Sequence, residues 1–174
     1  MKNFKFLSVL LFVALGATFQ SCKKDGDVHE IGDQEFVTTA GRIMAFELAA
    51  ANLVNSRTQA TSVRTFSNGL ITEHGKVTAE MQALAQQRFW IMPTELSTSQ
   101  QANITSLTAL NGAAFDKEFS RMMVASHQEA VDFYTRASSD NGTKSVELRM
   151  FADNKLPAMR TQLTSAQQLN TSLQ

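Results

Sequence analysis

Several residue types and motifs that identify common protein functions are scarce in this sequence or missing from it. The chain of 174 residues has one cysteine, so no intramolecular disulfide can form and the fold must be held by its core. It contains no glycine-rich phosphate loop, Gly-x-Ser-x-Gly elbow or His-Glu-x-x-His pair, and only 3 histidines. These absences argue against a hydrolase or transferase. Whether the protein is an enzyme stays open, with a preference for a non-enzymatic role.

The chain also lacks an excess of either charge. It has 16 lysines and arginines and 16 acids. The segment before the cysteine contributes two lysines and no acid, so its removal would leave a small negative net charge. Such a chain has neither the basic footprint of a nucleic-acid-binding protein nor a polybasic membrane patch. We therefore expect no nucleic-acid partner.

Long apolar runs are missing after residue 22, but a shorter one precedes it. Residues 1–5 carry two lysines, and residues 6–18 form an apolar run too short to span a bilayer comfortably, as in a signal peptide. The sequence Phe19-Gln20-Ser21-Cys22 that follows resembles a bacterial lipoprotein box, in which the cysteine is lipidated and becomes the new N-terminus. The resemblance implies a signal peptide over 1–21 and a lipid on Cys22. We expect this lipid to anchor the protein in the bacterial cell envelope, at the outer membrane.

The rest of the chain divides into a tether and a single domain. Residues 23–34 are charged, contain glycine and show no periodicity, so we expect Cys22 and a flexible tether over 22–34. His29 lies in this segment and is expected to be solvated rather than a ligand. From residue 35 to residue 174 the only periodicity is helical, which predicts one helical bundle domain.

The apolar spacing predicts helices over 35–56, 60–88, 98–110, 114–138 and 144–171. Because proline lacks a backbone donor, we expect a kink or a short break at Leu156–Pro157. Four long helices, one short helix and no alternating strand pattern predict an all-α four-helix bundle. The long connection between the second and third long helices holds the short helix. It suits a ferritin-like crossover, which we prefer, or a short helix that caps one end of an up-and-down bundle.

One acidic residue lies where an apolar residue is expected. At 100° per residue, Glu47 is about 20° from Phe36, in the middle of the apolar stripe of the first helix. His74 and His127 flank the stripes of their own helices, with Glu73 and Glu129 nearby. Bundles build metal sites from such groups on facing helices. An arginine on a neighbouring helix would equally satisfy a buried glutamate. The paired Glu-x-x-His motifs of a di-iron site are missing.

Several short motifs occur in a specific order over about 36–170. They are Glu47, Arg57, Val63-x-x-Phe66, Glu73-His74, Pro93, Leu96, Gly112-x-x-Phe115-Asp116, Met123-x-x-x-His127 and Leu156-Pro157. Their order and spacing resemble an uncharacterised bacterial envelope family, domain of unknown function 4142, whose members are often labelled ferritin-like or predicted outer membrane protein. The resemblance implies a ferritin-like bundle of unsettled activity in which Glu47, His74 and His127 match an acid and two histidines. A further histidine common in the family is Gln162 here.

Three functions remain open for this domain. We favour a non-enzymatic binding or stress-related accessory module of the cell envelope. The second is a ferritin-like metal-binding or metal-dependent redox protein, with Glu47, His74 and His127 as ligands of a transition metal and Glu73 or Glu129 as assistants. The third is a scaffold that docks a protein partner, which the sequence does not identify, through Trp90 and the apolar residues beside it.

The lipid anchor leads to the first prediction. Changing Cys22 to alanine should abolish incorporation of labelled fatty acid, because the acyl chains need the thiol, and should leave the chain soluble or uncleaved. Metabolic labelling of cells that produce either form measures the difference. Equal label on both forms would end the lipoprotein interpretation.

Overall fold

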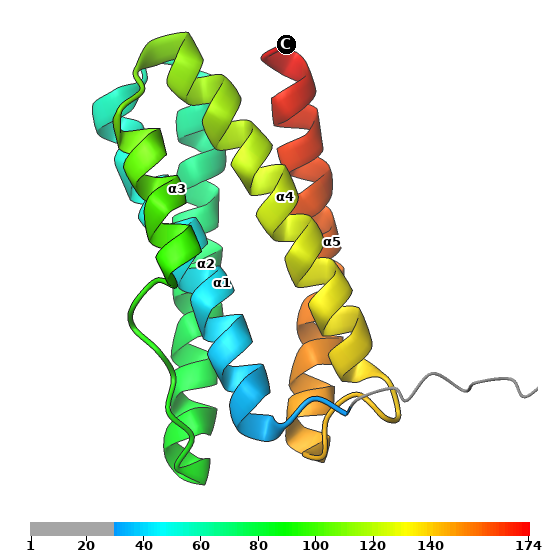
Figure 1. Cartoon of the computed structure of the whole chain (residues 1–174). Helices are drawn as coiled ribbons and strands as arrows, with labels where there is room; N and C mark the ends of the chain where they lie inside the picture. The colour runs from blue at the N-terminus through cyan, green and yellow to red at the C-terminus, as the bar shows by residue number, and fades with distance from the viewer. Residues whose placement is uncertain (1–29) are drawn as a thin grey trace, which may run out of the picture.

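The computed structural model describes residues 30–174, which fold into a bundle of five α-helices (Figure 1). They are α1 (Asp33–Arg57), α2 (Thr61–Arg88), α3 (Thr98–Thr108), α4 (Gly112–Ser138) and α5 (Val146–Ser172). The described residues contain no β-strand, only an isolated bridge between Ile31 and Thr143. The prediction of an all-α bundle with four long helices and one short helix is therefore confirmed. The signal peptide expected over 1–21 and residues 22–29 lie outside the described residues.

No helix within residues 30–174 combines the length and the apolar character needed to cross a membrane.

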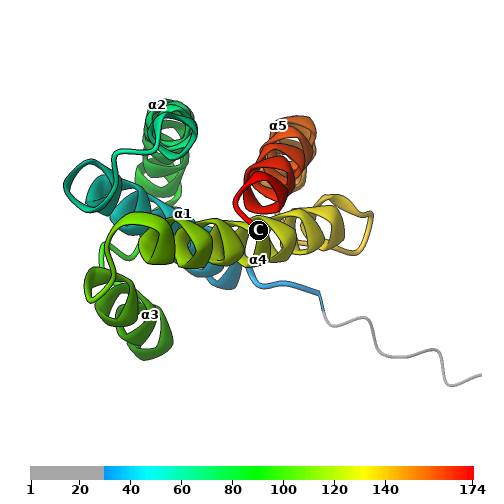
Figure 2. The same ribbon diagram turned by 90° about the horizontal axis from the view of Figure 1, so that it is seen from above.

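The long connection between α2 and α4 carries the chain back along the bundle. Arg57 at the end of α1 donates a hydrogen bond to Asn111 just before α4, and Arg88 at the end of α2 pairs with Glu147 at the start of α5. Helices α2 and α4 therefore run in the same direction. The short α3 lies along the outer flank of α1 and α4 and does not cover an end of the bundle (Figure 2). The connection is thus a crossover and not an end cap.

The apolar core consists of two clusters, one towards each end of the bundle. The cluster near the start of α1 contains Phe36 and Phe133, whose rings stack with centroids 5.3 Å apart. The cluster near the end of α1 contains Phe115 and Phe119, which stack at 5.8 Å. Each of the four long helices contributes residues to both clusters. The residues that separate the two clusters therefore lie at the same height on each long helix.

The folded domain begins earlier than the sequence predicts. Ile31 is buried, and its N–H donates a hydrogen bond of 2.7 Å to the carbonyl of Gly142 in the connection between α4 and α5. The connection itself folds tightly back against the end of α4, which requires glycine at residue 142, because a Cβ there would lie 2.3 Å from the carbonyl oxygen of Ala137. Asp33 then starts α1 and accepts a hydrogen bond from the N–H of Ser145. Residues 31–34, expected to end the flexible tether, are instead part of the bundle.

The short break expected at Leu156–Pro157 does not occur, because α5 is a single helix from Val146 to Ser172. Proline removes one backbone donor from the helix, but the buried Leu156 and Met159 on either side keep their packing in the core. The proline itself is exposed to solvent. Burial of the flanking side chains therefore outweighs the loss of one helical hydrogen bond.

The burial of Ile31 leads to the second prediction. In the full chain, Ile31→Ala should lower the free energy of unfolding by about 2–5 kcal/mol, because it removes a buried side chain and leaves a cavity. Urea denaturation followed by circular dichroism measures the loss. The matched control is Val146→Ala, an exposed position at the same end, where the change should stay within about 0.5 kcal/mol. If the two variants have the same stability, residue 31 belongs to a tether after all.

Candidate functional site

A layer of polar side chains lies between the two apolar clusters. Each long helix provides one member, namely Glu47 from α1, His74 from α2, His127 from α4 and Gln162 from α5. These four residues, called the polar layer below, line an internal cavity of about 10 Å³. That volume is close to the smallest that holds one water molecule. The bundle thus brings together three residues predicted as ligands and the glutamine noted for its unusual identity.

Helical phase explains the burial of Glu47 but not that of His127. Glu47 is 1% exposed, as its place in the apolar stripe predicts, and Met44 and Ala51 on either side of it along α1 are buried as well. His127 is only 2% exposed, although it lies about 100° from the centre of the stripe expected for its helix. Helix α4 packs against both α1 and α5, so its buried arc is wider than one stripe. The sequence therefore understated the burial of His127.

The Glu47 carboxylate bridges the two imidazoles. Its Oε2 forms a hydrogen bond with Nε2 of His74. Its Oε1 lies 2.8 Å from Nδ1 of His127, which is within ion-pair distance, but the atoms are not aligned for a hydrogen bond. The two imidazole rings are stacked, with centroids 6.0 Å apart and planes at 24°. In the described part of the chain, both ion pairs of Glu47 are with histidine, so the arginine considered as an alternative partner is not used.

The surroundings keep Glu47 charged and Tyr134 neutral. Burial alone would raise the pKa of the Glu47 carboxyl, but His127 and His74 oppose it and hold this pKa well below its usual range. For the Tyr134 phenol, burial and then the nearby Glu47 charge raise the pKa well above its usual value. The layer therefore contains an ionised carboxylate beside a phenol that keeps its proton.

Many polar atoms in and beside the layer have no hydrogen-bond partner among the described residues. They are Oε1 of Glu47, Nδ1 of His74, both ring nitrogens of His127 and the hydroxyl of Tyr134. Oε1 of Glu47 and Nδ1 of His127 still face each other at ion-pair distance, whereas each of the other three atoms costs about 1–3 kcal/mol relative to a paired one. Since native proteins pair nearly all their buried polar groups, a concentration of exceptions is typical of a functional site.

The layer is not a preformed metal cage. Within residues 30–174, no three or more histidine, cysteine, aspartate or glutamate side chains are arranged so that they could already hold one ion. The reason is local, because the carboxylate of Glu47 contacts both imidazoles directly. The chemistry of the donors fits a transition metal, whereas their present positions favour contacts among themselves. Any ion would have to replace those contacts.

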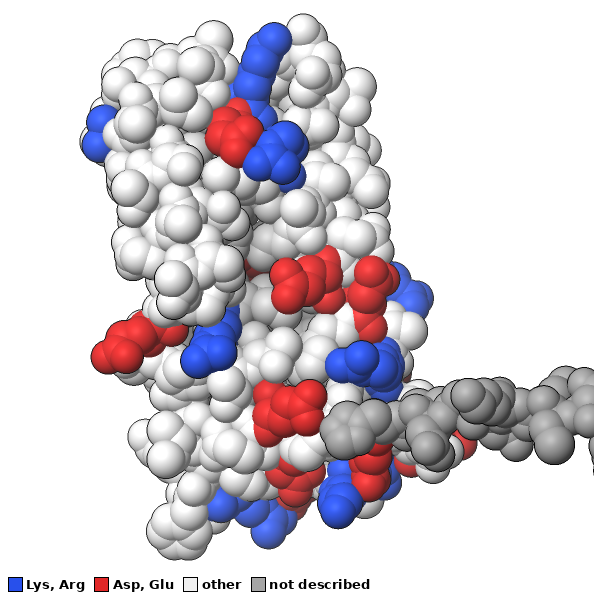
Figure 3. Space-filling model, in the orientation of Figure 1, with Lys and Arg blue, Asp and Glu red and all other residues white. Residues whose placement is uncertain are grey.

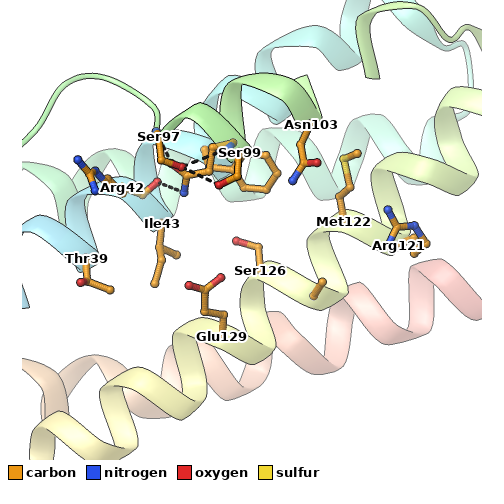
Figure 4. Close-up of a pocket in the computed structure, with 13 residues that line it drawn as sticks. Thr39, Arg42, Ile43, Ser97, Ser99, Asn103, Arg121, Met122, Ser126 and Glu129 are labelled. Atoms are coloured by element: carbon orange, nitrogen blue, oxygen red, sulfur yellow. Dashed lines mark hydrogen bonds between the residues drawn. The ribbon is translucent and has the colours of Figure 1, made fainter. Parts of the chain in front are cut away.

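The two acids expected to assist lie outside the layer. Glu73 is exposed and pairs with Lys76 at 2.8 Å, one turn further along α2. Glu129 is also exposed and lines a separate hollow of about 380 Å³ between α1, α3 and α4, together with Arg42 and Ser126 (Figure 4). Both lie on the solvent side of their helices, about 100–200° of rotation from the histidine that is nearest in sequence. His29 falls outside the described residues.

Among the other residues that line the cavity, three with an oxygen or sulfur atom in the side chain were not predicted as members of the site. They are Tyr134, Met44 and Met159. Tyr134 follows His127 by seven residues, so the two share a face of α4, and this spacing was the available signal. The two methionines have no such signal, because methionine at helical spacing usually fills a core.

Comparisons with known proteins agree on the class of fold. A family model described as domain of unknown function (DUF4142) matches residues 18–169. Among solved structures, CopM in the Cu(II)-bound form has a TM-score of 0.68 and 18% identity, over 83% of this chain and 99% of that chain. A DUF305 fragment from Deinococcus radiodurans has a TM-score of 0.65 and 18% identity, over 80% and 95%. At such low identity these structures show a shared helical-bundle fold alone. No curated protein matches the sequence.

The lowered pKa of Glu47 leads to the third prediction. A carboxyl whose pKa is lower in the folded than in the unfolded state stabilises the fold above its ordinary value of 4.5, and this contribution is lost as the pH falls below that value. Between pH 6 and pH 3, wild type should therefore lose stability more steeply than Glu47→Gln, by at most about 1.4 kcal/mol per pH unit.

Urea denaturation at each pH measures the two slopes. The matched control is Glu129→Gln, which removes an exposed carboxyl from α4 and should keep the wild-type slope. Parallel curves for wild type and Glu47→Gln would mean that Glu47 is not held ionised in the folded protein.

Proposed function

The chain belongs to the domain of unknown function 4142 family, and we propose that it is a non-enzymatic envelope protein that binds one transition-metal ion in its polar layer. The observation that carries the proposal is the meeting of Glu47, His74 and His127 from three helices, with one buried ring nitrogen of each histidine left without a partner among the described residues. A core built only for stability would have apolar residues at these positions. A divalent ion held by these three groups would replace the imidazole contacts that now compensate the buried charge of Glu47.

The donor set indicates the class of ligand. One carboxylate and two imidazoles are typical ligands of zinc, copper, iron and nickel, and the ionised Glu47 would offset part of the charge of a divalent ion. The atoms that would hold it are the Glu47 carboxylate, Nε2 of His74 and Nδ1 of His127. A bound ion would supply a fixed positive charge joining three helices and, for copper or iron, a redox centre. CopM, which has a copper-bound structure, has the same fold, and this supports testing copper first.

Metal binding at this site has to compete with protons. The carboxylate gives up its contacts with the imidazoles when it becomes a ligand, and the imidazole nitrogen that binds must lose its hydrogen. Affinity should therefore fall as the pH decreases. Gln162, half-buried at the edge of the cavity, is the fourth group of the layer and offers an amide where the resemblance implies a histidine. Because an amide is a weaker metal ligand than an imidazole, Gln162 is consistent with a site that exchanges its ion.

The arrangement of the bundle also supports a ferritin-like classification. Parallel α2 and α4 joined by a long crossover, with a polar layer at mid-height, are features of ferritin-like bundles. The missing Glu-x-x-His pairs favour a single ion over the di-iron pair of that class. For location, the apolar leader and Ser21-Cys22 support a lipid-anchored protein of the bacterial outer membrane.

Metal titration of the purified chain provides the fourth prediction. After treatment with a chelator, the protein should bind one Cu²⁺ or Zn²⁺ per chain by isothermal titration calorimetry, and its melting temperature should rise with metal concentration. Glu47→Gln and His74→Gln should each weaken binding by more than about tenfold and abolish the rise in melting temperature. Glu73→Gln and Glu129→Gln remove acids that lie outside the layer and serve as matched controls that should bind as wild type does.

A variant that is expected to bind metal more tightly keeps the test informative even if Glu47→Gln or His74→Gln fails to fold. Gln162→His adds a third imidazole to the same cavity and should tighten binding by about tenfold or more. If neither wild type nor Gln162→His binds any of these metals, the polar layer is a purely structural acid–imidazole network and the proposal fails.

A further inference from the structure

The large apolar side chains that the described residues expose to solvent all lie at one end of the bundle. They are Phe89, Ile91, Val146 and Met150, with exposures of 93%, 77%, 57% and 59%. This end is where α1 begins, because Gln34 exchanges two hydrogen bonds with the backbone of Ile91, and Arg88 pairs with Glu147. We call these four residues the apolar end. Within residues 30–174 the opposite end has no exposed side chain of this class.

The backbone conformation of the turn after α2 directs Phe89 and Ile91 towards the solvent. Phe89 has a left-handed backbone with φ of 57°, the one non-glycine residue described with positive φ. This conformation is unfavourable for a residue with a side chain, and the exposed phenyl ring gains no burial in return. Trp90, expected from the sequence to form a contact patch, instead packs partly against the core, while Phe89 and Ile91 on either side project to solvent. Local strain and exposed apolar surface together indicate a surface that is covered by a partner.

The number of residues between Cys22 and the bundle indicates which partner this is. Cys22 lies eight residues before Glu30, so a lipid on Cys22 can be at most about 28 Å from the start of the bundle. The far end of the bundle is about 42 Å away, the length of the 28-residue α2. We propose that the apolar end docks on the lipid bilayer that holds the anchor, with Phe89 and Ile91 in the interface between headgroups and acyl chains. This inference rests on the proposed lipid anchor and is independent of metal binding.

Charge at this end indicates how the contact is made. The hollow between the turn and α5 is lined by the bases Arg88 and Lys144 and by the acids Asp33 and Glu147. Figure 3 shows basic and acidic residues intermixed over the lower part of one face and no patch of a single sign there. The contact with lipid is therefore apolar, and docking should not depend on anionic lipid or on salt.

Trp90 is the only tryptophan of the chain and reports directly on this end. We would reconstitute the full, lipid-bearing protein in phosphatidylcholine vesicles with and without brominated acyl chains, and measure quenching of tryptophan fluorescence. Wild type should be quenched, equally so when a quarter of the lipid is made anionic. The double variant Phe89→Gly/Ile91→Ser should lose about half of the quenching or more, since it removes two of the four apolar side chains. Ala113→Ser, an exposed change at the opposite end, is the matched control and should behave as wild type does.

The substitution of Phe89 by glycine distinguishes an effect on membrane docking from an effect on the stability of the fold. Glycine suits a positive φ, so Phe89→Gly alone should keep or raise the melting temperature in solution while it weakens quenching by vesicles. A loss of stability instead would assign Phe89 to the fold and overturn the proposal.

If the protein is lipidated but Trp90 is not quenched, the docking proposal is also wrong, whereas the lipid anchor is still supported. If Cys22 carries no lipid but vesicles still quench Trp90, docking stands without the anchor. If the chain neither carries lipid nor is quenched, both proposals fail. A wild-type dimer that Phe89→Gly/Ile91→Ser converts to monomer, without quenching, would assign the apolar end to a second copy.

Discussion

The contact of the Glu47 carboxylate with two imidazoles is the constraint on which the arrangement of the bundle depends. An ionised carboxylate in an apolar core is tolerated only when opposite charge or hydrogen-bond donors surround it, and here they come from α2 and α4. Sliding either helix by one turn would move its histidine by about 5.4 Å and leave the charge uncompensated. Apolar packing tolerates several alignments of neighbouring helices, so this contact selects one of them.

The same layer limits how much stability the core can provide. Apolar contacts are interrupted at mid-height, and the two clusters on either side each rely on their own aromatic stacks. The unpaired ring nitrogens and the Tyr134 hydroxyl cost free energy that a layer of leucine and valine would not. This cost is the physical ground for assigning a function to the layer, because a bundle selected for stability alone would have no reason to keep it.

Much of this could be predicted from the sequence, and the failures have identifiable causes. The spacing of apolar residues located all five helices to within two residues, and helical phase placed Glu47 in the core, because both depend on local geometry alone. The burial of His127 depended on α4 having neighbours on two sides, and that of Ile31 on a contact with residue 142, neither of which a local pattern contains. Glu73 and Glu129 were expected to flank the apolar stripes of their helices, but they lie 100° and 200° around the helix from His74 and His127, and both are exposed.

The parallel course of α2 and α4 has a consequence for the order in which the chain folds. Glu47 and His74 are 27 residues apart on adjacent helices of a hairpin, whereas His127 can arrive only after the crossover has closed. Closing a longer loop costs more chain entropy, so contacts within the hairpin form before those that need the crossover. During synthesis, we therefore expect the carboxylate to meet one histidine partner before it meets the second. The second half of the molecule then docks onto a hairpin in which Glu47 is still exposed on one side, and docking buries the carboxylate and brings His127 against it.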